Sequence, residues 1–261
     1  MISRERAGFL EISGTHLYTV LHEVADPLAR VLLIGPFGSE RCAAYIPLVR
    51  WARFLAAREI EVLRYDYRGM GESTGVFEEM SFEKWAEDVE FLAGWLRHRT
   101  PKTPLILHGL EMGALLANRA FASGIADASL LWAPPASANE VLRSALLRHV
   151  TLENVFQYGQ PRRPLSDYTR RLESGFLEVD GHNWSSRLWQ DSFHLQLRHA
   201  SASDGIRPEE RPVRTIRLDK SAAPLVRGSA YEAMNPDLTS LFDENFVWIA
   251  EVSKKVSADV H

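Results

Sequence analysis

The sequence lacks the features that mark several large classes of protein. Its 261 residues include a single cysteine, Cys42, so no disulfide can form within the chain, and we expect a reducing compartment. No apolar run approaches the roughly 18 residues of a membrane span. Residues 1–6 lead into no apolar stretch of the secretory type. We therefore expect a cytoplasmic protein with no membrane span.

The sequence also carries little net charge. Its 30 Lys and Arg residues nearly balance 34 Asp and Glu residues, which leaves a net charge of -4. Such a balance creates no strong field for nucleic acid or an anionic membrane surface, so we expect neither as a partner. With 16 Gly and 13 Pro the composition is neither collagen-like nor low in complexity. The partners that remain are a small molecule or another protein.

Strand-like and helix-like segments alternate along the first half of the chain. Short runs rich in apolar residues at 31–34, 105–108 and 128–132, and the β-like segment at 60–65, predict strands, preceded by β-like stretches at 8–12 and 17–24. Between these runs, apolar residues at helical spacing predict helices at 43–58, 81–99 and 114–123, with Ser81 as a helix N-cap. This alternation predicts an α/β fold with a mostly parallel central sheet and helices on both faces.

The alternation breaks between about Ala138 and Pro212. This stretch offers helical pieces and a β-like run at 176–179, without the buried runs of sheet strands. We interpret residues 138–212 as a lid inserted over the ligand-binding edge of the sheet, and residues 1–137 and 213–261 as one core domain. After the insertion we expect a strand at 213–218, a weaker strand near 238–241 and an amphipathic helix at about 243–256.

One strand-to-helix turn has the pattern of a nucleophile elbow. In Gly109-Leu110-Glu111-Met112-Gly113, glycines lie two positions before and two positions after the central residue. A sharp elbow needs this spacing because larger side chains there would collide with the neighbouring strand or helix. The spacing matches G-x-S-x-G, but the centre is Glu111 instead of serine.

Together with two further motifs, this elbow resembles the α/β-hydrolase family. The segment from Asp66 to Ser73 is similar to the family's D-x-R-G-x-G-x-S segment, and the turn Gly35-Pro36-Phe37-Gly38 lies where the oxyanion loop would be. The resemblance covers residues 31–135 and continues from 213 to the end. It implies an α/β-hydrolase fold, with oxyanion and pocket residues Phe37, Gly38, Ser39 and Met112. More narrowly, residues 68–71 and 176–184 are similar to bacterial hydrolases associated with exosortase systems.

The family's mechanism needs a nucleophile at the elbow, an acid after a late strand and a histidine after the last strand. The resemblance places the acid at Asp219, with Asp237 or Asp243 as weaker candidates. The expected turn at 241–245 contains no histidine, and His261 is the final residue. Without an imidazole, no group can move a hydroxyl proton near neutral pH. His108, beside the elbow, is expected to pack under the end of the sheet.

The charge and the reach of the Glu111 side chain distinguish the possible functions. The start of a helix favours an anion, so we expect a carboxylate with a lowered pKa. Its side chain is long enough to reach the amides of Phe37 and Met112 and fill the oxyanion hole itself. The sequence therefore favours a hydrolase-like pseudoenzyme that binds a small acyl or ester-like ligand or a protein partner. No cofactor motif or metal-ligand spacing occurs, so we expect neither group.

Two other functions stay open. One is an active hydrolase, esterase-type or other, that uses Glu111 with Asp219, as an elbow aspartate works in the family's epoxide hydrolases and dehalogenases. Such chemistry still requires a base to activate water. The other is a structural subunit of a biosynthetic or export complex.

Overall fold

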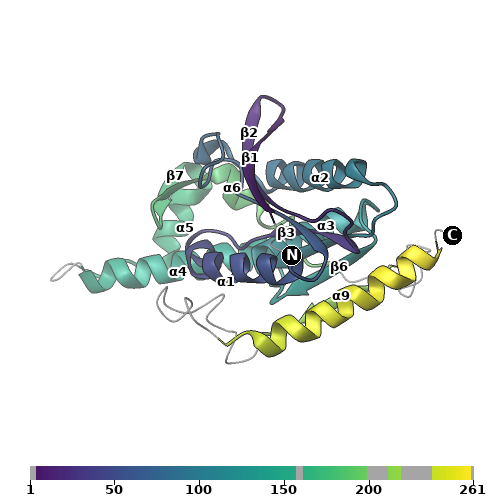
Figure 1. Ribbon diagram of the computed structural model, residues 1–261. Helices are drawn as coiled ribbons and strands as arrows, with labels where there is room; N and C mark the ends of the chain where they lie inside the picture. Colours follow the sequence, from purple (N-terminus) through teal and green to yellow (C-terminus); the bar gives the residue numbers. More distant parts are fainter. Residues whose placement is uncertain (1–3, 157–160, 199–210, 219–236, 260–261) are drawn as a thin grey trace.

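A computed structural model describes residues 4–156, 161–198, 211–218 and 237–259 (Figure 1). Seven strands form one sheet in the order β1-β2-β4-β3-β5-β6-β9. Their bounds are β1 (Arg4–Ile12), β2 (Thr15–Glu23), β3 (Ala29–Ile34), β4 (Ile60–Tyr65), β5 (Leu105–Leu110), β6 (Ala128–Trp132) and β9 (Val213–Ile216). From β4 to β9 neighbouring strands are parallel, while β1 and β2 add an antiparallel hairpin. The predicted mostly parallel sheet is confirmed.

Helices cover both faces of this sheet, as predicted. On one face lie α1 (Ser39–Ala56) and α9 (Thr239–Asp259), side by side in Figure 1. They enclose an apolar cluster in which Trp51 of α1 contacts Phe242 of α9, with 4.8 Å between ring centroids. The other face carries α2 (Phe82–Arg99) and α3 (Met112–Ala122), which pack against each other.

The sequence of α2 explains why a helix forms there. Ser81 is its N-cap, as predicted, and its hydroxyl accepts a hydrogen bond from the Lys84 amide at 3.3 Å. Trp85, Val89 and Leu96 recur at helical spacing and are fully or almost fully buried against the sheet. Three basic residues in the last turn complement the negative end of the helix dipole.

The prediction of a strand near 238–241 is wrong. Residues from Thr239 onward belong to α9, whose start is held by a hydrogen bond from the Thr239 amide to Asp237 Oδ1 at 3.1 Å. Leu238 and Phe242 are four residues apart and both face the α1 side of the core, which suits a helix better than a strand. Residues 241–245 are therefore helical, and within the described ranges the sheet ends at β9.

The chain between β6 and β9 forms a separate group of elements. These are α4 (Ala138–Phe156), α5 (Leu165–Ser174), the antiparallel pair β7 (Phe176–Val179) and β8 (His182–Ser185), and α6 (Ser186–Asp191). Neither β7 nor β8 joins the main sheet. Instead β8 packs on the short helix η1 (Phe77–Glu79), where the His182 ring stacks on Phe77 at 4.5 Å and Asn183 donates to Glu78 at 2.5 Å.

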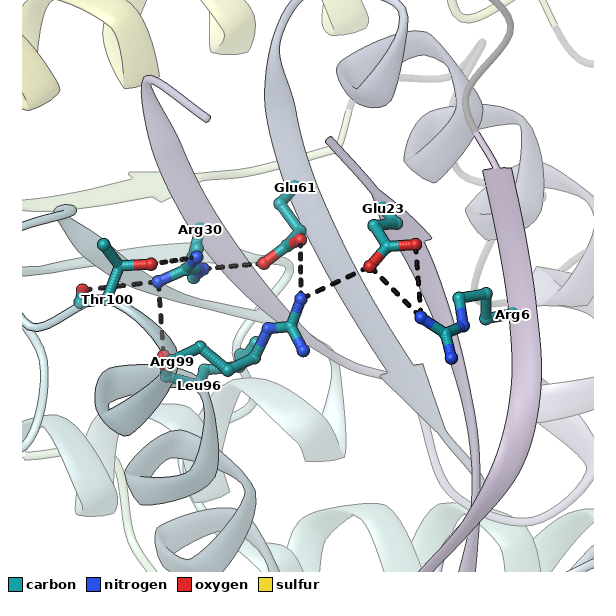
Figure 2. A network of polar contacts seen from close by, with 7 residues as sticks. All are labelled: Arg6, Glu23, Arg30, Glu61, Leu96, Arg99 and Thr100. Atoms are coloured by element: carbon teal, nitrogen blue, oxygen red, sulfur yellow. Dashed lines mark hydrogen bonds and ion pairs between the residues drawn. The ribbon is translucent and has the colours of Figure 1, made fainter. Parts of the chain in front are cut away.

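A row of ion pairs crosses the amino ends of β3 and β4, away from the elbow (Figure 2). Its centre is Glu61, whose side chain is fully buried and accepts from Arg30 Nε at 2.6 Å. Arg99 bridges from Glu61 at 3.5 Å to Glu23 at 3.6 Å, and Arg6 completes the row on β1. Because both oxygens of Glu61 face a guanidinium, the buried charge is compensated.

β1 ends the sheet on one side. All nine of its residues pair with β2, from Arg4 opposite Glu23 to Ile12 opposite Thr15. Most of its side chains are exposed, and the hairpin projects at the top of Figure 1. Within the described ranges no helix combines the length and apolar character that crossing a bilayer requires.

Candidate active site

The turn between β5 and α3 has the geometry of a strained elbow. Glu111 lies between the two elements with φ of 53° and ψ of -118°, a left-handed conformation that side chains other than glycine rarely adopt. A Cβ at Gly109 would lie 2.4 Å from Ala114 Cα, and one at Gly113 would lie 2.2 Å from the Ile34 carbonyl oxygen. Both glycines are therefore required by space, as their spacing in the sequence indicated.

The Glu111 carboxyl group turns back onto the backbone. Its Oε2 accepts a hydrogen bond from the Met112 amide at 2.5 Å, and the Phe37 amide acts on the same carboxyl group by favouring its charged form. These two amides come from the start of α3 and from the turn after β3. The predicted hydrogen bond between Glu111 and the Met112 amide is thus present.

The expected lowering of the Glu111 pKa is wrong. Burial raises it to about 8, since the residue is only 8% exposed and its charged form loses hydration. The Met112 and Phe37 amides act in the opposite direction, as does Arg148, while the negative charge of Glu40 adds to the increase. Two amides and a helix terminus do not offset burial, so at pH 7 the carboxyl group is mostly protonated.

An aromatic cluster keeps water away from the turn after β3. Phe37 is 1% exposed, and its ring centroid lies 5.5 Å from that of Trp85, 5.9 Å from Trp184 and 6.2 Å from Phe77. These rings come from α2, β8 and η1. The elements between β6 and β9 thus contribute directly to the cover over the Phe37 turn.

A second contact from these elements was not predicted from the sequence. Arg148 of α4 forms an ion pair with Glu40 in the first turn of α1, and its Nη2 donates to Ser39 Oγ at 3.5 Å. Ser39, a predicted pocket residue, is exposed. No sequence signal joins positions 40 and 148, because the pair depends on where α4 packs.

The segment from Asp66 to Ser73 fixes a turn. Asp66 accepts from Arg41 at 2.5 Å through one oxygen and from the Glu72 amide at 3.0 Å through the other. Ser73 Oγ donates to the Asp66 carbonyl oxygen at 2.6 Å and accepts from the Tyr18 amide at 2.9 Å. Every one of these contacts is within the protein scaffold.

The Arg68 side chain, the remaining charged member of this motif, also points inward. It forms a buried ion pair with Asp88 of α2, and its carbonyl oxygen accepts from the Trp85 indole at 3.0 Å. Tyr67 donates its hydroxyl to the Gly35 carbonyl oxygen at 2.6 Å and so holds the turn that leads to Phe37. The motif therefore positions the loop beside Glu111.

The His108 side chain packs against Trp51 and Trp132 and is not hydrogen-bonded to the elbow residue Glu111. It lies on β5 with its ring toward the α1 face, where Nδ1 accepts from the Trp51 indole at 2.9 Å and the ring packs on Trp132 at 4.4 Å. Burial lowers its pKa to about 3, so it is neutral at pH 7. The predicted packing role of His108 agrees with these contacts. In the part of the chain that the structure describes, no histidine is hydrogen-bonded or ion-paired to Glu111.

The remaining triad candidates divide between two groups. Asp219, together with His199 and His261, lies outside the described residues. Asp237 is bonded to the Thr239 amide, which lowers its pKa, and Asp243 is part of α9. Among the residues that the structure describes, no three His, Cys, Asp or Glu side chains lie close enough together to hold a metal ion.

Comparisons with known proteins agree with this fold. The chain is 28% identical over 159 residues to the uncharacterized protein YfhR of Salmonella typhimurium, a match covering 58% of the chain and 52% of YfhR. The chain thus spans about half the length of this curated relative.

Solved structures resemble the chain over nearly its whole length. The structure of Est1E from Butyrivibrio proteoclasticus with bound ferulic acid has a TM-score of 0.64 at 14% identity, covering 94% of this chain and 98% of Est1E. The α/β hydrolase GrgF from a Penicillium species has a TM-score of 0.60 at 16% identity, covering 98% and 99%. At these identities the similarity shows a shared fold.

The family itself is identified by a match over more than half of the chain. Residues 28–170, more than half of the chain, match the family described as serine aminopeptidase, S33. This range contains the Phe37 turn, the segment from Asp66 to Ser73 and the Glu111 elbow. The narrower similarity to exosortase-associated hydrolases stays a prediction. The chain belongs to the serine aminopeptidase S33 family of the α/β-hydrolase superfamily.

Proposed function

We propose that this chain is a hydrolase homologue that has lost the serine mechanism and binds a small acyl or ester-like ligand at the elbow. In this proposal residues 138–212 act as a lid over a core made of residues 1–137 and 213–261. One observation carries it: the Glu111 carboxyl group accepts the hydrogen bond of the Met112 amide, the amide that directly follows the elbow residue.

The chemistry of ester cleavage explains why this contact matters. A tetrahedral intermediate needs backbone amides aimed at its developing oxyanion. Here an oxygen of Glu111 already accepts from the Met112 amide, so a substrate carbonyl oxygen would have to displace it. The elbow also lacks a serine, cysteine or aspartate that could attack.

The same carboxyl group suits binding. With a pKa of about 8 it carries a proton at pH 7 and can donate one hydrogen bond while accepting from the amides. A carbonyl oxygen of an ester or amide is a matching acceptor. An acyl or ester-like ligand, which offers such an acceptor without a charge, therefore matches the site.

The raised pKa also supports a second function. A carboxyl group that titrates near pH 8 is suited to proton transfer at neutral pH. Glu111 would then act as a general base or nucleophile, with Asp219 as the second acidic group. This alternative predicts turnover that depends on Glu111.

Activity assays separate the two functions. Purified wild type, Glu111→Ala and Glu111→Ser are incubated with short-chain aryl esters, with Glu87→Ala on the exposed side of α2 as the control. We expect background hydrolysis in all four. Turnover in the wild type and in Glu87→Ala that disappears in Glu111→Ala would contradict the proposal and favour the second function.

A fluorophosphonate probe tests whether a base lies within reach of the elbow. The probe needs an activated hydroxyl, so we expect no labelling of Glu111→Ser. Labelling of that variant would show that a base outside the described residues reaches the elbow. Binding is tested by thermal unfolding with an uncleaved short-chain ester, which should raise the wild-type melting temperature as its concentration increases.

A further inference from the structure

A surface hollow lies apart from the elbow, on the α1 side of the sheet. It is formed by α1, the carboxyl ends of β3 and β4, and the Gly35-Pro36 turn, and its empty volume, open solvent included, is about 440 Å³. Neither Glu111 nor Phe37 lines it. The hollow is therefore a separate candidate site.

Arg64 of β4 places a positive charge in this hollow. Its Nε donates to His22 Nε2 at 3.3 Å, and its guanidinium carbon lies 5.6 Å from the centre of the Tyr45 ring. No ion pair within the described ranges involves Arg64. The nearest acidic group, Glu5, is hydrogen-bonded to Arg53 at 2.5 Å.

The histidine beside Arg64 does not change this charge. His22 is fully buried, and burial together with the Arg64 charge lowers its pKa to about 4. It is therefore neutral at pH 7 and acts only as an acceptor for Arg64. The guanidinium has no ion pair within the described ranges and keeps most of its donors, an arrangement that favours an anion.

The second arginine in the hollow is already engaged. Arg41 pairs with Asp66 Oδ1 at 2.5 Å, and the other Asp66 oxygen accepts from the Glu72 amide. Arg41 and Asp66 thus cancel each other, and Arg64 gives the hollow one net positive charge. A ligand with a single negative charge would complement Arg64.

The rest of the wall is apolar or aromatic. Leu33, Leu48 and Pro36 line one part, and the 46% exposed ring of Tyr45 lines another. Pockets that combine apolar walls with a single placed charge bind amphiphilic small molecules. Since a guanidinium matches a carboxylate through two parallel hydrogen bonds, the charged end of the ligand fits a carboxylate.

We propose that this hollow binds a small carboxylate with an apolar or aromatic body. The carboxylate pairs with Arg64, and the body lies against Tyr45, Leu48 and Pro36. This site differs from the one proposed for the elbow, because neither Glu111 nor Phe37 lines the hollow.

The test is isothermal titration of the full chain with phenylacetate, neutral phenylacetamide and inorganic phosphate. We expect phenylacetate to bind at least about tenfold more tightly than either of the others, since only it supplies both the charge and the body. Arg64→Gln should weaken phenylacetate binding by about tenfold or more. Tyr45→Ala, which changes an exposed side chain, should weaken it to a smaller extent.

Arg58→Gln is the matched control. Arg58 also lies over an aromatic ring, with 3.5 Å between its guanidinium carbon and the Phe54 ring centre, but it does not line the hollow. Its substitution should leave phenylacetate binding unchanged. Equal binding of phenylacetate and phenylacetamide, equal binding of phosphate, or binding that Glu111→Ala abolishes and Arg64→Gln does not would each overturn the proposal.

Discussion

At the residue scale, Glu111 combines two opposing influences. Its backbone is strained at φ of 53°, and its carboxyl group accepts from the Met112 amide, which together with the Phe37 amide favours the charged form. Burial outweighs both amides and raises the pKa to about 8. The carboxyl group is thus held in place by hydrogen bonds but kept neutral by its surroundings.

This raised pKa predicts a specific pH dependence of stability. Between pH 4.5 and 8 the folded chain keeps a proton on Glu111 that the unfolded chain has lost, so the free energy of unfolding falls as the pH rises. The expected fall is roughly 1.4 kcal/mol per pH unit, on the order of 5 kcal/mol in total, with no further loss above pH 8. Urea unfolding at several pH values measures it.

Glu111→Gln is the reference for that measurement. Glutamine has nearly the same shape and cannot ionise, so the difference between wild type and variant isolates Glu111 from the other titrating groups. We expect the wild type to lose stability relative to the variant across this pH range. A constant difference from pH 5 to 9 would show that Glu111 has an ordinary pKa.

The two elbow glycines make a prediction about packing. Gly113→Ala would place a Cβ 2.2 Å from the Ile34 carbonyl oxygen, so the backbone must move. We expect a loss of about 3 kcal/mol or more in the free energy of unfolding. Gly94→Ala is the control: nothing lies within 4 Å of a Cβ there, and in α2 it should stabilise the chain by roughly 0.5–1 kcal/mol. Equal effects of the two changes would be inconsistent with a crowded elbow.

Sequence reasoning located this site but not its electrostatics. The glycine spacing predicted the elbow, and the length of the Glu111 side chain predicted its contact with the Phe37 and Met112 amides. The pKa could not be predicted because the burial that raises it comes from packing between distant segments. The aromatic contact between Trp184 and Phe37 illustrates this, since 147 positions separate them.

At the element scale, sequence patterns predicted the sheet and failed where a short segment was ambiguous. The runs at 31–34, 60–65, 105–108 and 128–132 all lie in strands, because each is rich in the large apolar residues that both faces of a parallel sheet bury, although 60–65 also contains Glu61 and Arg64. Leu238 and Leu241 also fit a strand by composition. They belong instead beside and within α9, where contacts with α1 that no local pattern shows favour the helix.

The ion-pair row at the amino ends of β3 and β4 predicts how these strands are stabilised. Glu61→Gln leaves the guanidinium of Arg30, 4% exposed, without a charged partner. We expect a loss on the order of 3 kcal/mol in the free energy of unfolding. Glu23→Gln, at the more exposed end of the row, should cost at most about 1 kcal/mol. Urea unfolding of both variants checks this, and a larger loss for Glu23→Gln would refute it.

At the scale of the whole molecule, a charged residue of α4, which lies between β6 and β9 in the chain, affects the pKa of the elbow residue Glu111. Arg148 of α4 lowers the pKa of Glu111 and Glu40 of α1 raises it. Arg148→Gln should therefore raise the pKa of Glu111, and Glu40→Gln should lower it. These opposite effects make the two variants controls for each other.

Both pKa shifts are measured by urea unfolding at several pH values, as for the wild type. In Glu40→Gln the loss of stability should stop at a lower pH than in wild type, and in Arg148→Gln it should continue to a higher pH. Shifts in the same direction, or none, would mean that α4 does not approach the elbow in solution.

The position of β1 at the margin of the sheet has a consequence for self-association. An open strand can add the same strand of a second molecule, and an antiparallel copy centred on Gly8 would put Glu5 opposite Glu11. Two carboxylates facing each other across such a pair repel. The charge order of this strand therefore disfavours a dimer in which two molecules pair through their β1 strands.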